Sequence, residues 1–221
     1  MLSVESVSKS YGPNLRALSN ITFTVNKGEM VFLAGASGAG KSTLMRLLYL
    51  EEKPTSGKIQ LENFDLSSLT KRRIPIFRRR LGIVFQDFRL IPERTAAENV
   101  ALSLEVVGKS KKVIRRRVDE MLKLVGLWQR KNNYPDQLSG GEAQRVAMAR
   151  AMINEPLIIL ADEPTGNLDT ENARAVFKLF DEINLRGATI LIATHQIHLA
   201  KEFGKKIIHM DAGELESGNN E

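Results

Sequence analysis

The chain has 221 residues, and its content of 43% apolar and 26% charged residues is that of a globular protein, not of a disordered tail. It contains no cysteine, which excludes disulfides and thiolate metal sites. No apolar run approaches the roughly 18–20 residues that span a bilayer. The N-terminal segment MLSVESVSKS lacks the pattern of a signal peptide. We therefore expect any membrane role to depend on a partner or a surface contact.

The net charge of +6 is unevenly distributed along the chain. Two runs, KRRIPIFRRR (71–80) and KSKKVIRRR (109–117), hold much of the excess. Such runs can face a nucleic acid, an anionic membrane or an acidic partner, although solvated helix faces are the simpler interpretation of each run alone.

Short β-branched runs predict strands, and helical patterns lie between several of them. Strands are expected near 3–8, 19–25, 30–34, 57–61, 81–85, 157–161, 189–193 and 206–210. Helices are expected near 42–50, 96–106, 111–125, 141–154, 171–186 and 196–203. Residues 1–86 and 157–221 carry most of the strands, whereas residues from about 87 to 156 are almost wholly helical. Since parallel strands need helical crossovers, we predict one α/β domain with a mixed sheet core and a helical insertion.

The first chemical motif is GASGAGKST, which follows the expected strand 30–34 and precedes a helical pattern. It fits G-x-x-x-x-G-K-[ST] in the strand–loop–helix context that this phosphate-binding pattern requires. Glycines let backbone N–H groups curl around phosphate oxygens, and the helix N-terminus adds donors and a partial positive charge. We expect Lys41 to reach the β- and γ-phosphates of a nucleotide, and Ser42 to ligate Mg²⁺. The residues expected to hold the nucleotide here are Gly35, Ala36, Ser37, Gly38, Ala39, Gly40, Lys41, Ser42 and Thr43.

The second motif is LIILADEPT, a buried-strand pattern that delivers Asp162 and Glu163 at its end. Active sites of open α/β sheets lie outside the carboxyl ends of the strands, so this placement is informative. Adjacent carboxylates on a strand end point in different directions. We assign Asp162 to Mg²⁺ through water and Glu163 as the base that polarises the attacking water. An acidic turn without function is the alternative.

The third motif is LSGGEAQR, in which Ser139 and Glu142 have the spacing of a capping box before a helical pattern. A plain cap needs Ser and Glu but does not need Gly140 and Gly141. A helix that begins with two glycines forgoes helix propensity, which suggests that something approaches its backbone closely. The motif therefore predicts a second phosphate-binding helix terminus.

Together these three motifs resemble the ATP-binding-cassette (ABC) family, and the resemblance covers essentially the whole chain. It implies a P-loop NTPase fold with a mixed β-sheet core, an antiparallel β part and a helical subdomain, and it implies ATP and Mg²⁺ as ligands. It also implies that the segment from Ser139 to Glu142 binds the γ-phosphate of an ATP held on the glycine loop of a second copy. Two ATP molecules would then lie at a head-to-tail homodimer interface that forms on ATP binding.

Further positions fit the family pattern. Gln86, which ends the strand-like run LGIVF, resembles the glutamine that contacts Mg²⁺ and senses the membrane partner. His195 resembles the switch histidine at the γ-phosphate, and Tyr11 resembles the aromatic residue that stacks on adenine, although each also has a purely structural interpretation. The loop 166–169, which ends at Asp169, resembles the segment that links the two sites of the dimer. Gln196 departs from the aspartate that cassettes usually carry there, which bears on the local tuning of hydrolysis.

The run ADEPTGNLD narrows the resemblance to a branch that includes lipoprotein-release, macrolide-export and cell-division ATPases, and the segment 75–90 looks most like the cell-division FtsE group. That group implies that the chain lies at the cytoplasmic face of the inner (plasma) membrane, where an integral membrane partner of the FtsX type holds it. It also implies activation of peptidoglycan hydrolases outside and an association with the FtsZ filament. The motor of a lipoprotein or small-molecule exporter is the alternative.

Two other classes of protein fit the sequence less well. A cassette-type nucleic-acid ATPase usually carries long coiled coils, zinc motifs or two cassettes, and since the sequence has none of these, no nucleic-acid partner is expected. A non-hydrolysing scaffold is disfavoured because all the catalytic positions are filled.

Overall fold

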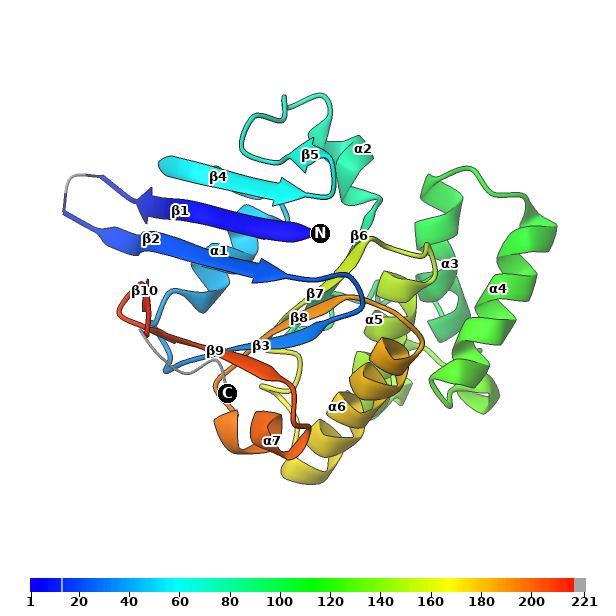
Figure 1. Ribbon diagram of the computed structural model, residues 1–221. Helices are drawn as coiled ribbons and strands as arrows, with labels where there is room; N and C mark the ends of the chain where they lie inside the picture. The colour runs from blue at the N-terminus through cyan, green and yellow to red at the C-terminus, as the bar shows by residue number, and fades with distance from the viewer. Residues whose placement is uncertain (13, 217–221) are drawn as a thin grey trace.

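Two β-sheets, with helices between and beside them, make up the structure (Figure 1). The computed structural model describes residues 1–12 and 14–216. A four-stranded antiparallel sheet has the order β2-β1-β4-β5, and a six-stranded sheet has the order β10-β9-β3-β8-β7-β6. In the second sheet β9, β3, β8, β7 and β6 run parallel, and β10 pairs antiparallel with β9. The strands are β1 (Leu2–Ser10), β2 (Arg16–Val25), β3 (Met30–Ala34), β4 (Ser56–Leu61), β5 (Phe64–Asp65), β6 (Leu81–Phe85), β7 (Ile158–Asp162), β8 (Ile190–Thr194), β9 (Lys206–Asp211) and β10 (Glu214–Leu215).

Helices lie on both faces of the six-stranded sheet, and others lie beside it (Figure 1). They are α1 (Lys41–Leu48), α2 (Ile74–Arg78), α3 (Ala96–Val106), α4 (Lys111–Leu124), α5 (Gly140–Met152), α6 (Thr170–Leu185) and α7 (Ile197–Glu202), with short 3-10 turns at Trp128–Arg130 and Pro135–Gln137. Between residues 87 and 156 the chain forms α3, α4, α5 and the two 3-10 turns, and no strand.

Alternation along β3 explains why the core has two parts. Val31 and Leu33 pack with α1 and the antiparallel sheet, whereas Met30 and Phe32 pack with the helices of the opposite face. The Phe32 ring meets Phe177 of α6 edge to face, with 5.6 Å between the ring centroids. Helix α1 therefore lies between the two sheets, and its apolar side chains from Leu44 to Leu48 supply packing to this part of the core (Figure 1).

The eight expected strands and six expected helices are all present, with ends shifted by a few residues. The strands β5 and β10 were not expected, because two residues are too short to show an alternating pattern. Helix α2 was not expected either, because it lies within the basic run 71–80 and is held by tertiary contacts. Phe77 is buried there, and Arg78 donates hydrogen bonds to the carbonyls of Tyr49 and Leu50. Part of that run is therefore packed against the core and is not a solvated face.

The parallel strands direct the loops that follow β3, β6, β7 and β8 to the same edge of the sheet. These loops carry the phosphate motif, Gln86, the Asp162–Glu163 pair and His195. Among the residues that the structure describes, no helix is both long enough and apolar enough to cross a membrane.

Candidate active site

The glycine loop after β3 presents an uncapped helix start. Gly40 stands at the N-cap of α1 with φ of 101°, no side chain caps the helix, and its first turn has no acidic residue. A Cβ on Gly40 would lie 2.9 Å from the carbonyl oxygen of Ala17, so both the backbone conformation and the space require glycine. The free N–H groups and the helix dipole together form an anion-binding terminus.

Lys41 is turned back over this loop. Its side chain is only 4% exposed, and its Nζ donates to the carbonyl oxygens of Gly35 at 2.7 Å and Ala36 at 2.9 Å. The same Nζ lies 3.3 Å from a carboxylate oxygen of Glu163. A buried ammonium group is thereby fixed at the loop where phosphate oxygens would bind.

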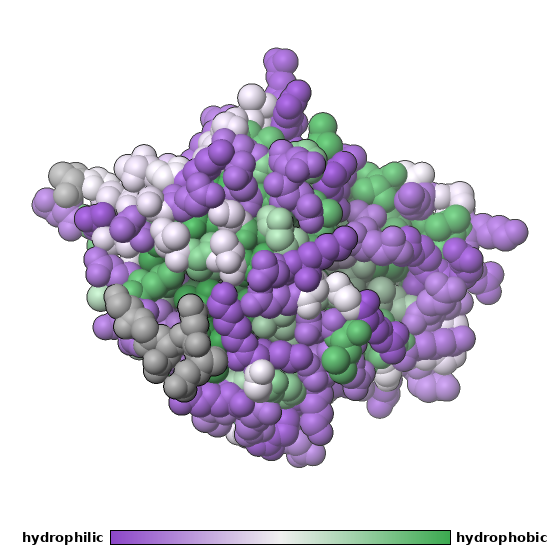
Figure 2. Space-filling model, in the orientation of Figure 1, coloured by the Kyte–Doolittle hydropathy of each residue, from purple (hydrophilic) through white to green (hydrophobic). Residues whose placement is uncertain are grey.

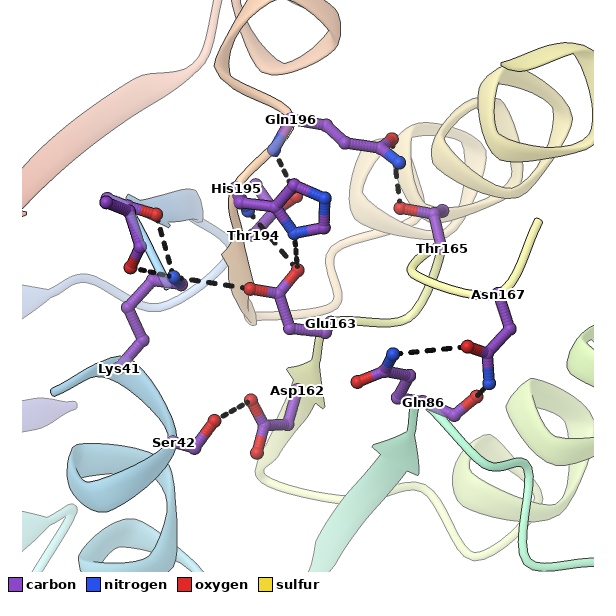
Figure 3. Close-up of polar contacts among 12 residues, drawn as sticks. Lys41, Ser42, Gln86, Asp162, Glu163, Thr165, Asn167, Thr194, His195 and Gln196 are labelled. Atoms are coloured by element: carbon purple, nitrogen blue, oxygen red, sulfur yellow. Dashed lines mark hydrogen bonds and ion pairs between the residues drawn. The ribbon is translucent and has the colours of Figure 1, made fainter. Parts of the chain in front are cut away.

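The two carboxylates at the end of β7 point to different partners (Figure 3). Asp162 accepts a hydrogen bond of 3.1 Å from the Ser42 hydroxyl. Burial raises the pKa of the Asp162 carboxyl, and the hydrogen bond from Ser42 opposes this shift. Glu163 lies on the other side, where one carboxylate oxygen faces Lys41 and the other is 2.8 Å from Nδ1 of His195.

The backbone of Glu163 explains this divergence. Its φ of 47° is in the left-handed region, which a residue other than glycine adopts at a cost in free energy. The conformation is held by hydrogen bonds from the Glu163 N–H to the carbonyl of Ala193 and from the Gly166 N–H to the carbonyl of Glu163. The strain therefore serves to aim the carboxylate at Lys41 and His195 instead of along the strand.

Gln86, at the end of β6, is tied to the loop after the acidic pair. Its side-chain amide donates to Asn167 at 3.2 Å, and the Asn167 amide donates to the Gln86 carbonyl at 3.1 Å. A Cβ at position 166 would lie 2.7 Å from the Gln86 side chain, so Gly166 allows this close approach.

Two neighbouring cavities open at these loops. The first has a volume of about 530 Å³ and is lined by loop residues that include Lys41 and Ser42, together with Gln86 and Glu163. The second has a volume of about 410 Å³, and Ser42, Gln86, Asp162 and Asn167 are among the residues that line it. Ser42 and Gln86 therefore stand between the two cavities.

Several residues that line the first cavity were not singled out by sequence reasoning. They come from the start of β2 and from the turn between β9 and β10, and they are Leu15, Arg16, Ala17, Ala212 and Gly213. Only the turn pattern Ala212-Gly213 could have drawn attention from sequence alone.

Tyr11 does not line either of these two cavities. Its side chain is 38% exposed, and its hydroxyl donates a 2.8 Å hydrogen bond to Glu52, which also pairs with Lys9 at 2.9 Å. Lys9 in turn lies over the Tyr11 ring, 5.0 Å from its centroid. The stacking of Tyr11 on adenine stays a prediction.

The third motif forms the start of α5. Ser139 accepts a hydrogen bond from the Glu142 N–H, and the Glu142 carboxylate accepts one of 2.9 Å from the Ser139 N–H, which completes a capping box. Ser139 and Gly140 are exposed, and neither lines the two cavities described above. The structure thus brings the first two motifs together and leaves the third apart from them.

Gly141 has a close neighbour within its own chain. A Cβ at this position would lie 2.5 Å from the side-chain oxygen of Asn172 in α6. Asn172 is held in place by Asp169, which caps α6 and accepts hydrogen bonds from the Asn172 backbone and side chain. Packing within the chain therefore accounts for Gly141, and the binding of a phosphate by this helix start stays a prediction.

Gln196, at the N-cap of α7, also has local partners. Its side-chain oxygen accepts a hydrogen bond of 3.2 Å from the Thr165 hydroxyl, and its N–H donates to the Thr194 hydroxyl at 3.0 Å. The residue thus joins the loops that follow β7 and β8, beside the Glu163–His195 contact (Figure 3).

The donor set of the second cavity suits Mg²⁺. It combines a hydroxyl, a carboxylate and an amide oxygen, from Ser42, Asp162 and Gln86. Mg²⁺ prefers oxygen ligands and is commonly held by one or two protein groups together with substrate phosphates and water. In the described part of the chain no cluster of three His, Cys, Asp or Glu side chains could hold a metal by itself. The residues present therefore fit a metal that arrives with a phosphorylated ligand.

These features define a P-loop nucleotide-binding protein. A glycine loop follows a buried parallel strand and leads into an uncapped helix, and a carboxylate at the end of a neighbouring strand accepts a hydrogen bond from the hydroxyl of that helix. The ABC transporter family model matches residues 18–166, and the chain belongs to this family of ATPases.

Relatives match over nearly the full length. The cell division ATP-binding protein FtsE of Bacillus subtilis is 46% identical over 213 residues, which cover 96% of this chain and 93% of the relative. The protein of the same name from Mycobacterium tuberculosis is 47% identical over 216 residues, which cover 97% and 94%. A solved dimeric ATP-binding cassette, bound to ADP and Pi in a post-hydrolysis state, is 38% identical with a TM-score of 0.87, covering 98% of this chain and 97% of that chain.

Proposed function

We propose that this chain is the ATP-binding and hydrolysing subunit of an FtsEX-type membrane complex, which couples ATP hydrolysis to cell division and to the activation of peptidoglycan hydrolases. The names and near-full-length identity of the relatives support the cell-division assignment. The contact of Glu163 with both Lys41 and His195 is the observation that carries the hydrolytic part.

The proposed chemistry assigns one task to each side chain. The loop N–H groups and Lys41 hold the β- and γ-phosphates, and Ser42, Gln86 and Asp162 hold Mg²⁺, which would neutralise phosphate charge. Glu163 takes the proton of the attacking water, because its carboxylate lies beside the position that Lys41 marks for the phosphate. His195 orients that carboxylate and contacts the γ-phosphate.

The proposal includes a second copy of the chain. Ser139 and Gly140 are exposed but do not line the cavity of their own glycine loop, so a partner copy can bring its helix start to the ATP. The dimeric state of the related cassette supports this arrangement. Asp169 accepts a hydrogen bond from Asn172, and the Asn172 side chain lies against Gly141. These contacts support the assignment of Asp169 to the loop that connects the two sites.

An apolar groove supports the docking of a membrane partner. It has a volume of about 420 Å³ and lies between α2, β6, α3 and α5, with Leu81, Ile83, Leu102 and Val106 among its lining residues. Figure 2 shows hydrophobic residues at the surface in the region of α2 and α3. We assign this groove to a cytoplasmic segment of an FtsX-like protein, which would hold the chain at the inner face of the membrane, within reach of the FtsZ filament.

The variant Glu163→Gln tests the hydrolytic assignment. Loss of the base should reduce hydrolysis by about 10²–10⁴-fold and leave ATP binding within about twofold, since the amide keeps the size of the side chain. ATP-bound dimers should then accumulate in size-exclusion chromatography. Glu120→Gln, at an exposed position on α4, is the matched control and should behave as wild type. Wild-type turnover by Glu163→Gln would overturn the assignment of the base.

The partner is tested separately. Glu163→Gln loaded with ATP should retain its membrane partner during purification from membranes, and mass spectrometry should identify an FtsX-type protein. Recovery of a permease with a substrate cavity would instead make the chain an exporter motor and overturn the cell-division assignment.

A further inference from the structure

The loop that follows Gln86 has an unusual backbone. Phe88 has φ of 57° and Arg89 has φ of 47°, so two successive residues other than glycine adopt the left-handed region. Each such residue costs free energy and persists only where the surroundings impose the conformation. The loop therefore requires a group that holds it.

Arg150 of α5 supplies that group. Its guanidinium donates to the carbonyl of Phe88 at 2.7 Å and also to the carbonyl of Arg89. Arg150 forms no ion pair with a carboxylate in residues 1–12 and 14–216, and burial lowers the pKa of its guanidinium. Arg150 is half-buried, and a half-buried cation that relies on backbone carbonyls is costly to disturb, because its hydrogen bonds are its main compensation. The backbone carbonyl of Arg150 is itself bonded by the Ser103 hydroxyl at 2.9 Å.

The same helix also reaches the residue before Gln86. Gln144 of α5 is fully buried, and its side-chain amide points to the carbonyl of Phe85 at 3.5 Å. Gln86 is thus flanked on both sides by backbone carbonyls that α5 contacts, while its own side chain reaches Asn167. Ser139 caps the start of α5, and Arg150 near its end also lines the apolar groove. Helix α5 thus connects the third motif, the loop after Gln86 and the apolar groove.

We propose that Arg150 is a positioning residue: by holding the strained loop 87–89 it sets the place of Gln86 at the metal-binding cavity, and it links that cavity to the groove and to the start of α5. The proposal rests on the proposed role of Gln86 toward Mg²⁺. It assigns to Arg150 no contact with the nucleotide.

The test compares Arg150→Met and Arg150→Lys with wild type in two measurements. Binding of Mn²⁺, as a paramagnetic substitute for Mg²⁺, is titrated by electron paramagnetic resonance in the presence of ADP. Hydrogen exchange of the amides in residues 86–91 is followed by mass spectrometry. We expect Arg150→Met to weaken Mn²⁺ binding about tenfold and to speed exchange in the loop. Arg150→Lys should be intermediate, because an ammonium group can serve one carbonyl but lacks the planar fork. If Arg150→Met does not fold, Arg150→Lys is compared with wild type in its place.

A double-mutant cycle with Gln86→Ala separates positioning from general damage. If Arg150 acts through Gln86, then Arg150→Met should weaken Mn²⁺ binding by less than about twofold once Gln86 is absent. Arg117→Met, which removes a partner of Glu155 in the helical part, is the control for destabilisation and should leave Mn²⁺ affinity unchanged. Full additivity in the cycle, or unchanged exchange in the loop, would overturn the proposal. Failure of Gln86→Ala alone to weaken Mn²⁺ binding would instead refute the role of Gln86 in the proposed function.

Discussion

Helices α1 and α5 both begin at a glycine-rich loop, but their starts differ in how the free N–H groups are used. At α1 the N-cap is Gly40 and no side chain serves the first turn. At α5 the Ser139 side chain and the Glu142 carboxylate form a reciprocal pair of hydrogen bonds with the backbone. The N–H groups at the start of α1 are therefore free to bind a ligand, whereas some of those at the start of α5 already donate to side chains of the same helix start.

This difference indicates how each start can hold a phosphate. The α1 loop can surround an anion with backbone donors and Lys41. At α5 the residues Ser139 and Gly140 are exposed, and the Ser139 hydroxyl can still donate its own proton while it accepts from the Glu142 N–H. The start of α5 can therefore contact one side of a phosphate that a second protein surface already binds.

Among the predictions that test this comparison, the largest effect is expected at Ser139. Aspartate is as good an N-cap as serine, but its charge repels a phosphate. Ser139→Asp should therefore keep the thermal stability within about 2 °C, and should lower ATP hydrolysis about 10²-fold together with ATP-dependent dimer formation. Calorimetry, a phosphate-release assay and size-exclusion chromatography would measure these three quantities.

Two matched variants separate capping from phosphate binding. Ser139→Ala loses the cap and should cost about 1 kcal/mol of stability. Thr95→Asp changes the N-cap of α3, which has the same capping box, and should leave hydrolysis unaffected. If Ser139→Asp hydrolysed ATP at the wild-type rate, Ser139 would be a cap and nothing more.

A smaller effect is expected at Gly141, where the comparison turns on packing. Alanine favours a helix over glycine by about 1 kcal/mol, yet here its Cβ would meet Asn172 at 2.5 Å. We expect Gly141→Ala to destabilise the protein by about 1–2 kcal/mol in urea unfolding. The added change Asn172→Ala should recover part of this loss. A stabilised Gly141→Ala would show that the glycine is not required by the α6 contact.

The two helix starts also show what local sequence can predict. The spacing of Ser139 and Glu142 and the strand–loop–helix pattern around Lys41 are short-range, so both starts were expected from sequence. The cavity wall at Ala17 and Gly213 depends on long-range contacts instead. The Gly213 N–H donates to the Ala39 carbonyl, and the Ser19 N–H donates to the Gly213 carbonyl.

The same reason explains the strained positions. Nothing in the local sequence around Glu163 or Phe88 indicates a left-handed backbone, since neither is glycine or asparagine. Their conformations follow from partners distant in the chain, namely Ala193 for Glu163 and Arg150 for Phe88. Local motifs thus predicted which residues form the site, whereas the directions of their side chains depend on contacts made in the folded sheet.

The smallest expected effect on stability concerns Asp162, which accepts a hydrogen bond from the hydroxyl of Ser42, the second residue of α1. Burial raises the pKa of this carboxyl above its ordinary value of 3.8, so the folded state favours the neutral form. The stability that the neutral form provides is fully present below the ordinary value, and it is lost as the pH rises through the raised value. Near pH 7.5 and without nucleotide, Asp162→Asn should therefore raise the melting temperature by about 2–4 °C, on the order of 1 kcal/mol. Toward pH 4 this advantage should shrink, because the wild-type carboxyl becomes protonated.

The same variant should lose Mg²⁺-dependent hydrolysis, since a neutral amide cannot replace the carboxylate at the metal. If the melting temperature of Asp162→Asn instead fell below that of wild type at both pH values, the charged carboxyl would stabilise the fold, and burial would not disfavour it.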